Sequence, residues 1–230
     1  FHRPLEHTIE WIRSYFDRPG REKFIEPNIE ALKAGYVYAE ATELFATSYE
    51  VRPAPLREGT YRNINGNAGI VMGLIAASKK SGLPLFYAGY PITPASQILH
   101  ELSQYRHVGV KTVQCEDEIA AMGAAIGGAY GGALSITASS GPGIALKQEA
   151  LSLGIMMELP LVIVNVQRGG PSTGLPTKTE QSDLFQAICG RHGESPVPVL
   201  ATARPADCFD VAYAAARIAV KYMTPVIVLS

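Results

Sequence analysis

The feature that most constrains the fold is the alternation of short apolar segments with helical stretches after about residue 65. The predicted strands are 84–87, 107–113, 133–137, 159–166, 197–201 and 225–229. The predicted helices between and around them are 68–78, 95–104, 118–130, 143–157, 181–188 and 205–222. Near-continuous apolar strands that alternate with helices are typical of a parallel sheet covered by helices on both faces. The predicted fold class is therefore α/β, in which ligands bind beyond the carboxyl ends of the strands.

Residues 1–62 have a different pattern and are predicted to form a mostly helical tail and a linker. The apolar positions at helical spacing are Leu5, Ile9, Ile12 and Phe16, and then Ile29, Leu32, Tyr36 and Phe45. Pro19-Gly20 ends the first helix, and the Pro-rich 52–55 and polar 57–63 segments read as a linker. We thus expect a tail at 1–62 and a domain at 63–230. Because the chain begins on Phe1 without Met and ends directly after a strand, we expect it to be an excerpt of a longer polypeptide.

Composition narrows the class of protein. The sequence is 47% hydrophobic and 18% charged, which is the composition of a globular protein. Its net charge of −1 gives no electrostatic argument for binding to nucleic acid or to an anionic membrane. No apolar run reaches the roughly 20 residues of a membrane span. Cys115, Cys189 and Cys208 lie far apart and fit neither a metal site nor a secreted disulfide framework. A cytoplasmic location is the simplest expectation.

Three acidic residues stand where a predicted strand passes into a helix. Glu116 and Asp117 have an ordinary explanation, because carboxylates at a helix N-terminus interact favourably with the helix dipole. Glu118 differs, because the helix that it opens is too apolar and small-sided to face solvent. Its carboxylate is therefore expected to be partly removed from water, which makes it a candidate for proton chemistry. A plain capping role remains the alternative.

Three further loops follow predicted strands and should share the same sheet edge: 90–94, 139–143 and 167–174. Thr93 presents a hydroxyl between two prolines, and the alternative for this loop is a stiff turn. Ser140 and Gly141 offer free backbone donors at a helix start. Arg168 suits recognition of a carboxylate, although a structural salt bridge would explain it equally well. Lys178, Glu180 and Asp183 are predicted to form a solvated face.

Glycines recur at four-residue spacing in the helix after Glu118, at 123, 127 and 131 and at 128 and 132. Each glycine inside a helix costs about 0.5 to 1 kcal/mol relative to alanine. That cost predicts a close backbone approach, made either by another helix or subunit or by the chain's own sheet.

Three motifs together resemble a known family, the alpha subunits of 2-oxoacid:ferredoxin oxidoreductases. They are Tyr-Pro-Ile-Thr-Pro-Ala-Ser at 90–96, Glu118 with Ala121, Gly123 and Gly127 behind it, and Gln-Arg-Gly-Gly-Pro-Ser-Thr-Gly at 167–174. They occur in the family's order, and the resemblance runs from about residue 65 to 230. The tail is similar to the end of a gamma domain fused ahead of the alpha part, as in 2-oxoglutarate-type enzymes. Ala95 departs from the family, which often has Ser there.

The resemblance implies a thiamine diphosphate-binding domain of the pyrimidine-binding type. Glu118 would be catalytic and hydrogen-bond a nitrogen of the aminopyrimidine ring. The residues implied to bind the cofactor are Pro91, Ile92, Glu118, Ser140 and Gly141. Thr93 and Arg168 fall where the family binds the carboxylate of the substrate.

The same resemblance implies partners. A beta subunit would hold the diphosphate, its magnesium and a [4Fe-4S] cluster, so no metal site is expected in this chain. The implied reaction is coenzyme A-dependent oxidative decarboxylation of a 2-oxoacid, with 2-oxoglutarate favoured, to acyl-CoA and CO2 with electrons passing to ferredoxin, or its reverse. A dimer of alpha-beta units is expected. The alternatives are another thiamine diphosphate enzyme and a cofactor-free scaffold domain of the same fold.

Overall fold

A computed structural model describes residues 4–43, 47, 49–50, 52 and 54–230. The chain contains two compact units, Phe1–Tyr61 and Arg62–Ser230. The first unit pairs α1 (Glu6–Phe16) with α2 (Ile25–Ala41) through the short 3₁₀ helix η1 (Glu22–Phe24), with Ile12 and Ile29 buried. Both predicted tail helices are therefore present. Phe45, the last apolar position expected of the second helix, lies outside the described residues, as does part of the predicted linker.

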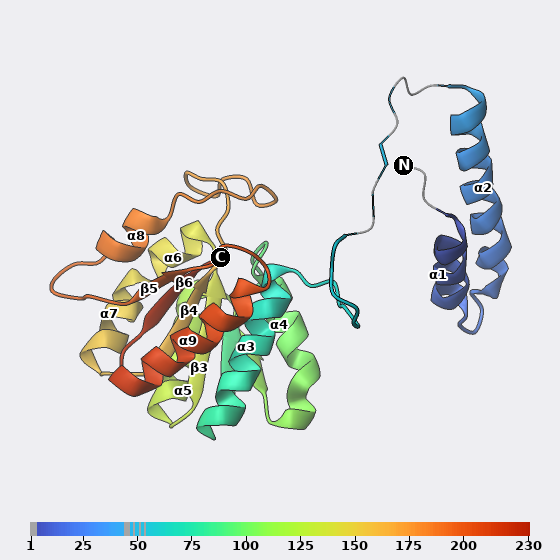
Figure 1. The fold of residues 1–230 in the computed structure, drawn as a ribbon. Helices are drawn as coiled ribbons and strands as arrows, with labels where there is room; N and C mark the ends of the chain where they lie inside the picture. The colour runs from blue at the N-terminus through green and yellow to red at the C-terminus, as the bar shows by residue number, and fades with distance from the viewer. Residues whose placement is uncertain (1–3, 44–46, 48, 51, 53) are drawn as a thin grey trace. The chain divides into compact units, whose positions relative to one another are not determined.

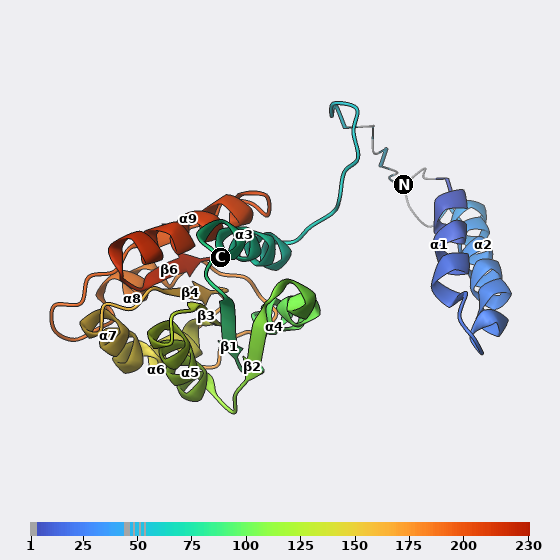
Figure 2. The same ribbon diagram turned by 90° about the horizontal axis from the view of Figure 1, so that it is seen from below.

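The second unit is built on one sheet of six parallel strands in the order β2-β1-β3-β4-β6-β5 (Figures 1 and 2). The strands are β1 (Leu85–Gly89), β2 (Lys111–Gln114), β3 (Leu134–Ser139), β4 (Leu161–Asn165), β5 (Val199–Ala201) and β6 (Val226–Leu229). Every residue of β3 and β4 is buried. This pattern is the one expected of strands that are covered on both faces.

Helices cover both faces of the sheet, which confirms the predicted fold class (Figure 2). One face carries α3 (Gly66–Ser81), α4 (Ser96–Leu102), which continues into the 3₁₀ helix η2 (Ser103–Val108), and α9 (Asp207–Tyr222). The other face carries α5 (Glu118–Tyr130), α6 (Gly141–Leu146), α7 (Gln148–Met156) and α8 (Leu184–Cys189). None of the helices in the described residues has the length and apolarity that crossing a membrane requires.

Two predicted elements differ from the observed ones. The strand expected at 107–113 begins only at Lys111, because η2 occupies 103–108 and Gly109, with φ +91°, ends it. The helix expected at 143–157 is divided into α6 and α7 at Lys147, whose backbone angles are φ −85° and ψ −6°.

The glycines of α5 have two different surroundings. A Cβ atom on Gly128 would come within 2.4 Å of the Phe86 ring and within 2.6 Å of the Ser135 hydroxyl, so this glycine lets the helix lie close to its own sheet. Gly123 and Gly127 face open space within the described chain. Packing on the sheet therefore explains Gly128 but neither of the other two.

The connections of the sheet reverse direction between β1 and β3. From β1 the chain moves to the edge strand β2 through α4, whereas from β3 it moves towards β4 through α6 and α7 on the opposite face. Where connections diverge in this way, the carboxyl ends of the two strands leave a crevice, which is the usual ligand site of such sheets.

Candidate active site

A hydrogen bond between side chains joins the carboxyl ends of β1 and β3. Tyr90 follows the last residue of β1, and its hydroxyl lies 2.8 Å from the Ser139 hydroxyl at the end of β3. Both residues are buried. Gly143 is the close neighbour of this pair, since a Cβ there would overlap both hydroxyl oxygens.

Glu118 begins α5, and its neighbour Asp117 caps the helix. The Asp117 carboxylate accepts a hydrogen bond of 2.8 Å from the amide of Ala120. Glu116 is exposed. The capping role that was the alternative for Glu118 therefore belongs to Asp117. Glu118 is half-buried, and it interacts with the Tyr90 hydroxyl.

Tyr90 is held as a neutral phenol. Burial raises its pKa first, and the hydrogen bond and charge of Glu118 raise it further. The hydrogen bond to Ser139 and the positive charge of Arg168 act in the opposite direction but do not prevail. The phenol thus keeps its proton, and its O–H can donate a hydrogen bond to a neighbouring carboxylate.

Lys147 belongs to the candidate site, although the sequence pattern did not predict it. It is only 2% exposed, and its Nζ donates to Thr137 Oγ1 at 2.8 Å and to the Ala138 carbonyl at 3.5 Å. Burial lowers the pKa of Lys147 to about 7, against the opposing effects of Glu118 and Cys115. The sequence held one sign of this burial. In the predicted helix, Lys147 lies on the same face as Gly143, four residues before it, and Leu151, four residues after it, and both of these are buried.

Arg168 and Thr93, the two residues implied to bind substrate, are brought together. Arg168 Nη1 donates to the backbone carbonyl of Thr93 at 2.6 Å, and Nη2 donates to the carbonyl of Thr173 at 2.8 Å. The guanidinium is buried and its Nε has no partner among the described residues. Thr93 is exposed.

The residues implied to bind the cofactor line the same edge. Pro91 is exposed and Ile92 is half-buried, and the Ser96 side chain fixes this loop by bonding to both the amide and the carbonyl of Ile92. Ser140, at the N-cap of α6, is buried and its hydroxyl has no partner in the described chain. Gly141 is half-buried against Asp183.

A cavity of about 490 Å³ opens at this edge beside Arg168. It is lined by α6, the loop 168–173, Asp183 and Gln186. The prediction of a solvated face was wrong for Asp183, which is half-buried and accepts a hydrogen bond of 2.8 Å from Asn165. Lys178 and Glu180 are exposed as predicted, with Glu180 also accepting from the Gly170 amide.

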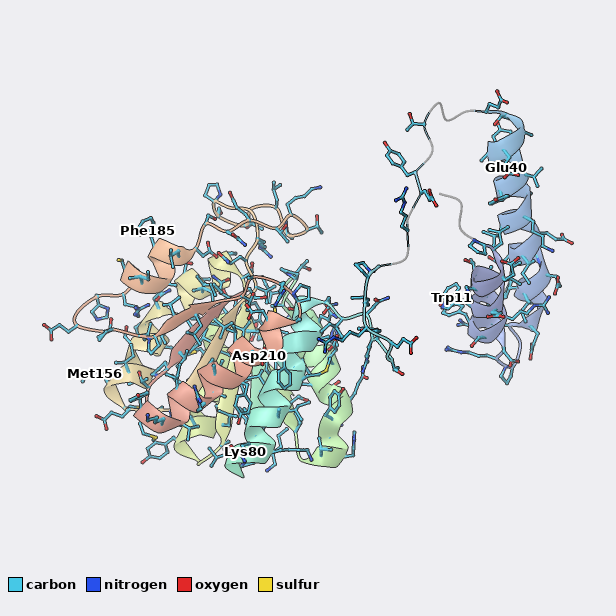
Figure 3. The ribbon with its side chains drawn as sticks, in the orientation of Figure 1. Trp11, Glu40, Lys80, Met156, Phe185 and Asp210 are labelled. Atoms are coloured by element: carbon cyan, nitrogen blue, oxygen red, sulfur yellow. The ribbon has the colours of Figure 1, made fainter. Side chains whose placement is uncertain are left out.

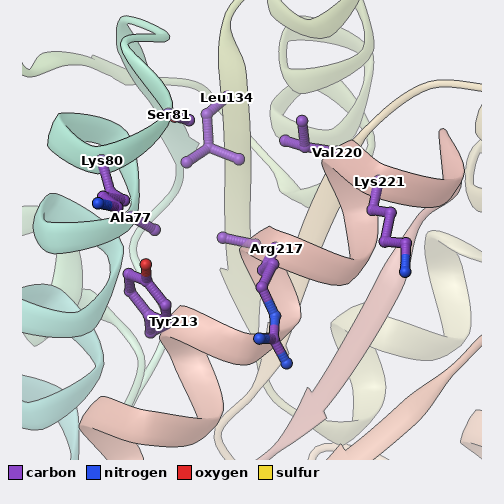
Figure 4. A pocket seen from close by; sticks show the side chains of 9 residues that line it. Ala77, Lys80, Ser81, Leu134, Tyr213, Arg217, Val220 and Lys221 are labelled. Atoms are coloured by element: carbon purple, nitrogen blue, oxygen red, sulfur yellow. The ribbon is translucent and has the colours of Figure 1, made fainter.

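A second cavity, of about 350 Å³, lies between α3 and α9 (Figure 4). Its lining includes Leu134, the first residue of β3, together with Lys80, Arg217 and Lys221. It is therefore at the amino ends of the strands, away from Glu118 and Arg168. In parallel sheets of this kind the chemistry takes place at the other edge, and this cavity is not the candidate active site.

Comparisons with known proteins define the class. The family described as "Pyruvate flavodoxin/ferredoxin oxidoreductase, thiamine diP-bdg" matches residues 77–230. This match and the parallel sheet define a thiamine diphosphate-binding domain. The chain belongs to the pyruvate flavodoxin/ferredoxin oxidoreductase family.

Individual relatives are similar over different parts of the chain. The 2-oxoglutarate oxidoreductase subunit KorA of Mycobacterium tuberculosis is 58% identical over 228 residues, which is 99% of this chain and 35% of that protein. The 2-oxoglutarate synthase subunit KorA of Archaeoglobus fulgidus is 45% identical over 168 residues, or 73% of this chain and 47% of that protein.

Among solved structures, the 2-oxoglutarate:ferredoxin oxidoreductase from Magnetococcus marinus, with 2-oxoglutarate, coenzyme A and succinyl-CoA bound, is similar over all of this chain and 39% of its own. Its TM-score is 0.78 and its sequence identity is 38%. The chain thus spans between a third and a half of the length of the relatives that it matches.

The residues at the carboxyl ends of β1 and β3 fit the aminopyrimidine half of thiamine diphosphate. That ring needs a carboxylate partner for one of its nitrogens. Glu118 is a half-buried carboxylate, and it does not cap the helix, because Asp117 does. The unpartnered hydroxyl of buried Ser140 offers a further polar contact at the same edge. In the described residues, no three His, Cys, Asp or Glu side chains come close enough together to hold a metal ion.

Proposed function

We propose that this chain is the alpha-subunit part of a 2-oxoacid:ferredoxin oxidoreductase, and that 2-oxoglutarate is its substrate. The reaction is coenzyme A-dependent oxidative decarboxylation to acyl-CoA and CO2, with electrons passed to ferredoxin, or its reverse. The partner is a beta subunit that carries the magnesium and the [4Fe-4S] cluster, the assembly is a dimer of alpha-beta units, and the location is cytoplasmic. The residues before 63 are then the end of a fused gamma domain.

The position of Glu118 carries the proposal. Its carboxylate lies at the N-terminus of α5, free of capping duty and beside the neutral hydroxyl of Tyr90. A carboxylate in this position can exchange a proton with the ring nitrogen of bound thiamine diphosphate, which supplies the nucleophilic carbon that attacks a 2-oxoacid. Tyr90 holds the carboxylate in place as a hydrogen-bond donor, and the Tyr90–Ser139 bond fixes the Tyr90 ring.

Arg168 and Thr93 support the choice of a 2-oxoacid. The contact between Arg168 Nη1 and the Thr93 carbonyl places a cation and a hydroxyl-bearing residue side by side, next to the cavity of about 490 Å³. The unpartnered Nε–H of Arg168 leaves it capacity to donate to a substrate carboxylate. The names of the relatives favour 2-oxoglutarate over other 2-oxoacids.

The test is an assay of the complete polypeptide, purified with its beta partner, for coenzyme A-dependent dye reduction with 2-oxoglutarate, pyruvate and a branched-chain 2-oxoacid. We expect turnover with 2-oxoglutarate to exceed that with the other two. Glu118→Gln should reduce the rate of hydrogen exchange at the thiazolium C2 of the bound cofactor by about 10²- to 10⁴-fold.

Glu116→Gln is the matched control, because it removes an exposed carboxylate two residues away and should leave that rate nearly unchanged. Equal effects of the two substitutions would mean that Glu118 is not the catalytic carboxylate. Another thiamine diphosphate enzyme would lack iron–sulfur absorbance in the purified complex, and a scaffold domain would bind no thiamine diphosphate.

A further inference from the structure

Lys147 is a buried cation that the proposed reaction does not yet use. It stands at the junction of α6 and α7 and is 2% exposed, and its ammonium group reaches under the carboxyl end of β3. There Nζ donates to Thr137 Oγ1 at 2.8 Å and more weakly to the Ala138 carbonyl at 3.5 Å. Both acceptors are uncharged, so neither neutralises the ammonium group.

The charged and titratable groups that face Lys147 come from three sides. Glu118 approaches from α5, Cys115 from the segment between β2 and α5, and Tyr90 from the end of β1. Nζ lies 5.7 Å from the centre of the Tyr90 ring. In the described part of the chain, no carboxylate oxygen lies within 4.0 Å of Lys147 Nζ, the limit for an ion pair. Glu118 therefore acts on Lys147 as a nearby charge without direct contact.

An unpaired ammonium group in this position is costly, because its hydration is lost and no anion replaces it. A methionine or leucine would fill the same space without the cost. The charge is therefore expected to have a use, and the site that it faces is the one that contains Glu118. The pKa of about 7 supports this reading, since a group with that value can change its charge at neutral pH.

We propose that Lys147 is a positioning residue for Glu118: its ammonium form stabilises the Glu118 carboxylate in the empty site, and it gives up a proton when the Glu118 site gains one on binding the aminopyrimidine ring. The inference rests on the proposed function, because it requires thiamine diphosphate at Glu118. One N–H bond at Nζ breaks, one proton is taken up between the Glu118 carboxylate and the ring nitrogen, and no electrons move.

The reason is charge balance. In the empty site the ammonium group faces one negative charge, that of Glu118. Once Glu118 and the ring nitrogen share an added proton, that negative charge is neutralised, and the buried ammonium group loses the larger of the two electrostatic effects that oppose its burial. Its proton is then released, so the unmodified protein needs little proton uptake from solvent when the cofactor binds.

The experiment is calorimetric titration of the complete alpha-beta assembly, stripped of cofactor, with thiamine diphosphate and magnesium. Runs in two buffers of different ionisation enthalpy give the number of protons taken up on binding. At about pH 6, below the pKa of Lys147, Lys147→Met should take up close to one proton more than the unmodified protein. At about pH 9 the difference should vanish, because Lys147 is already neutral there.

Lys79→Met is the control, because it removes the same charge from an exposed position on α3 and should leave the proton count unchanged. Lys147→Gln, which keeps an N–H donor for Thr137, should give the same count as Lys147→Met. Equal counts in the unmodified and Lys147→Met proteins would overturn the inference alone. Failure of both Lys147 variants to assemble would overturn it too, by making Lys147 structural. Absence of thiamine diphosphate binding in the unmodified assembly would overturn the proposed function as well.

Discussion

Replacing Lys147 with methionine should make the protein more stable. The pKa of Lys147 falls from an ordinary 10.5 to about 7 because of burial, and each pKa unit corresponds to about 1.4 kcal/mol. The penalty on the folded state at pH 6 is therefore about 5 kcal/mol. Methionine removes this penalty and keeps the unbranched shape, while Thr137 loses a hydrogen bond worth about 1 kcal/mol. The net expectation is a gain of about 4 kcal/mol in the free energy of unfolding.

The gain should depend on pH in a defined direction. Between about pH 7 and pH 10.5 the unfolded chain holds a proton on Lys147 that the folded chain lacks, so the unmodified protein becomes more stable as the pH rises. Below pH 7 both states are protonated and the penalty is constant. The advantage of Lys147→Met is thus largest below pH 7 and disappears near pH 10.5.

The assay is thermal unfolding of the complete assembly, stripped of thiamine diphosphate, at several pH values. For a unit of this size, about 4 kcal/mol corresponds to a rise of roughly 10 °C in the apparent midpoint. Lys79→Met should change it by no more than about 1 °C, because surface substitutions usually have small effects. A lower midpoint for Lys147→Met, or an unchanged pH dependence, would refute the claim that the buried ammonium opposes folding.

Two further predictions concern the substrate loop and α5. Arg168→Lys should raise the Michaelis constant for the 2-oxoacid more than it lowers kcat. Lysine keeps the charge but lacks the planar guanidinium that can donate to both the Thr93 carbonyl and a carboxylate. Steady-state kinetics measures both constants, and an unchanged Michaelis constant would mean that Arg168 does not bind the substrate. Gly128→Ala should lower the free energy of unfolding by about 1 to 3 kcal/mol, because its Cβ overlaps Phe86 and the sheet, whereas Gly127→Ala meets nothing within the described chain. Denaturant unfolding of the two variants separates them, and equal losses would contradict the packing described for α5.

The exposed apolar side chains show where the sequence pattern stops being informative. Met156 is 82% exposed and Phe185 is 80% exposed, and both project from the α7 and α8 side of the second unit (Figure 3). Helical periodicity predicts that such residues face a core. Nothing in the described chain covers them, so local pattern does not determine whether an apolar helical residue is buried.

The layered fold and the edge that carries the site could be predicted from the sequence, because both follow from local rules. Short apolar strands separated by helices allow few arrangements other than a covered parallel sheet. In that arrangement every strand-to-helix turn lies at one edge, which brings the loops of Thr93, Ser140 and Arg168 to the same edge as Glu118. The capping by Asp117 is equally local, since its acceptor and the Ala120 amide are three residues apart.

What the sequence could not provide are the contacts that cross between elements. The Tyr90–Ser139 bond joins residues 49 apart, and the Arg168–Thr93 bond joins residues 75 apart. A lysine in a helical run is ordinarily solvated, so only the tertiary packing that brings its ammonium group to Thr137 of β3 decides that Lys147 is buried. Local periodicity therefore determined the sheet and its functional edge, whereas tertiary packing decided which charges face Glu118, because burial and charge proximity depend on how distant segments meet.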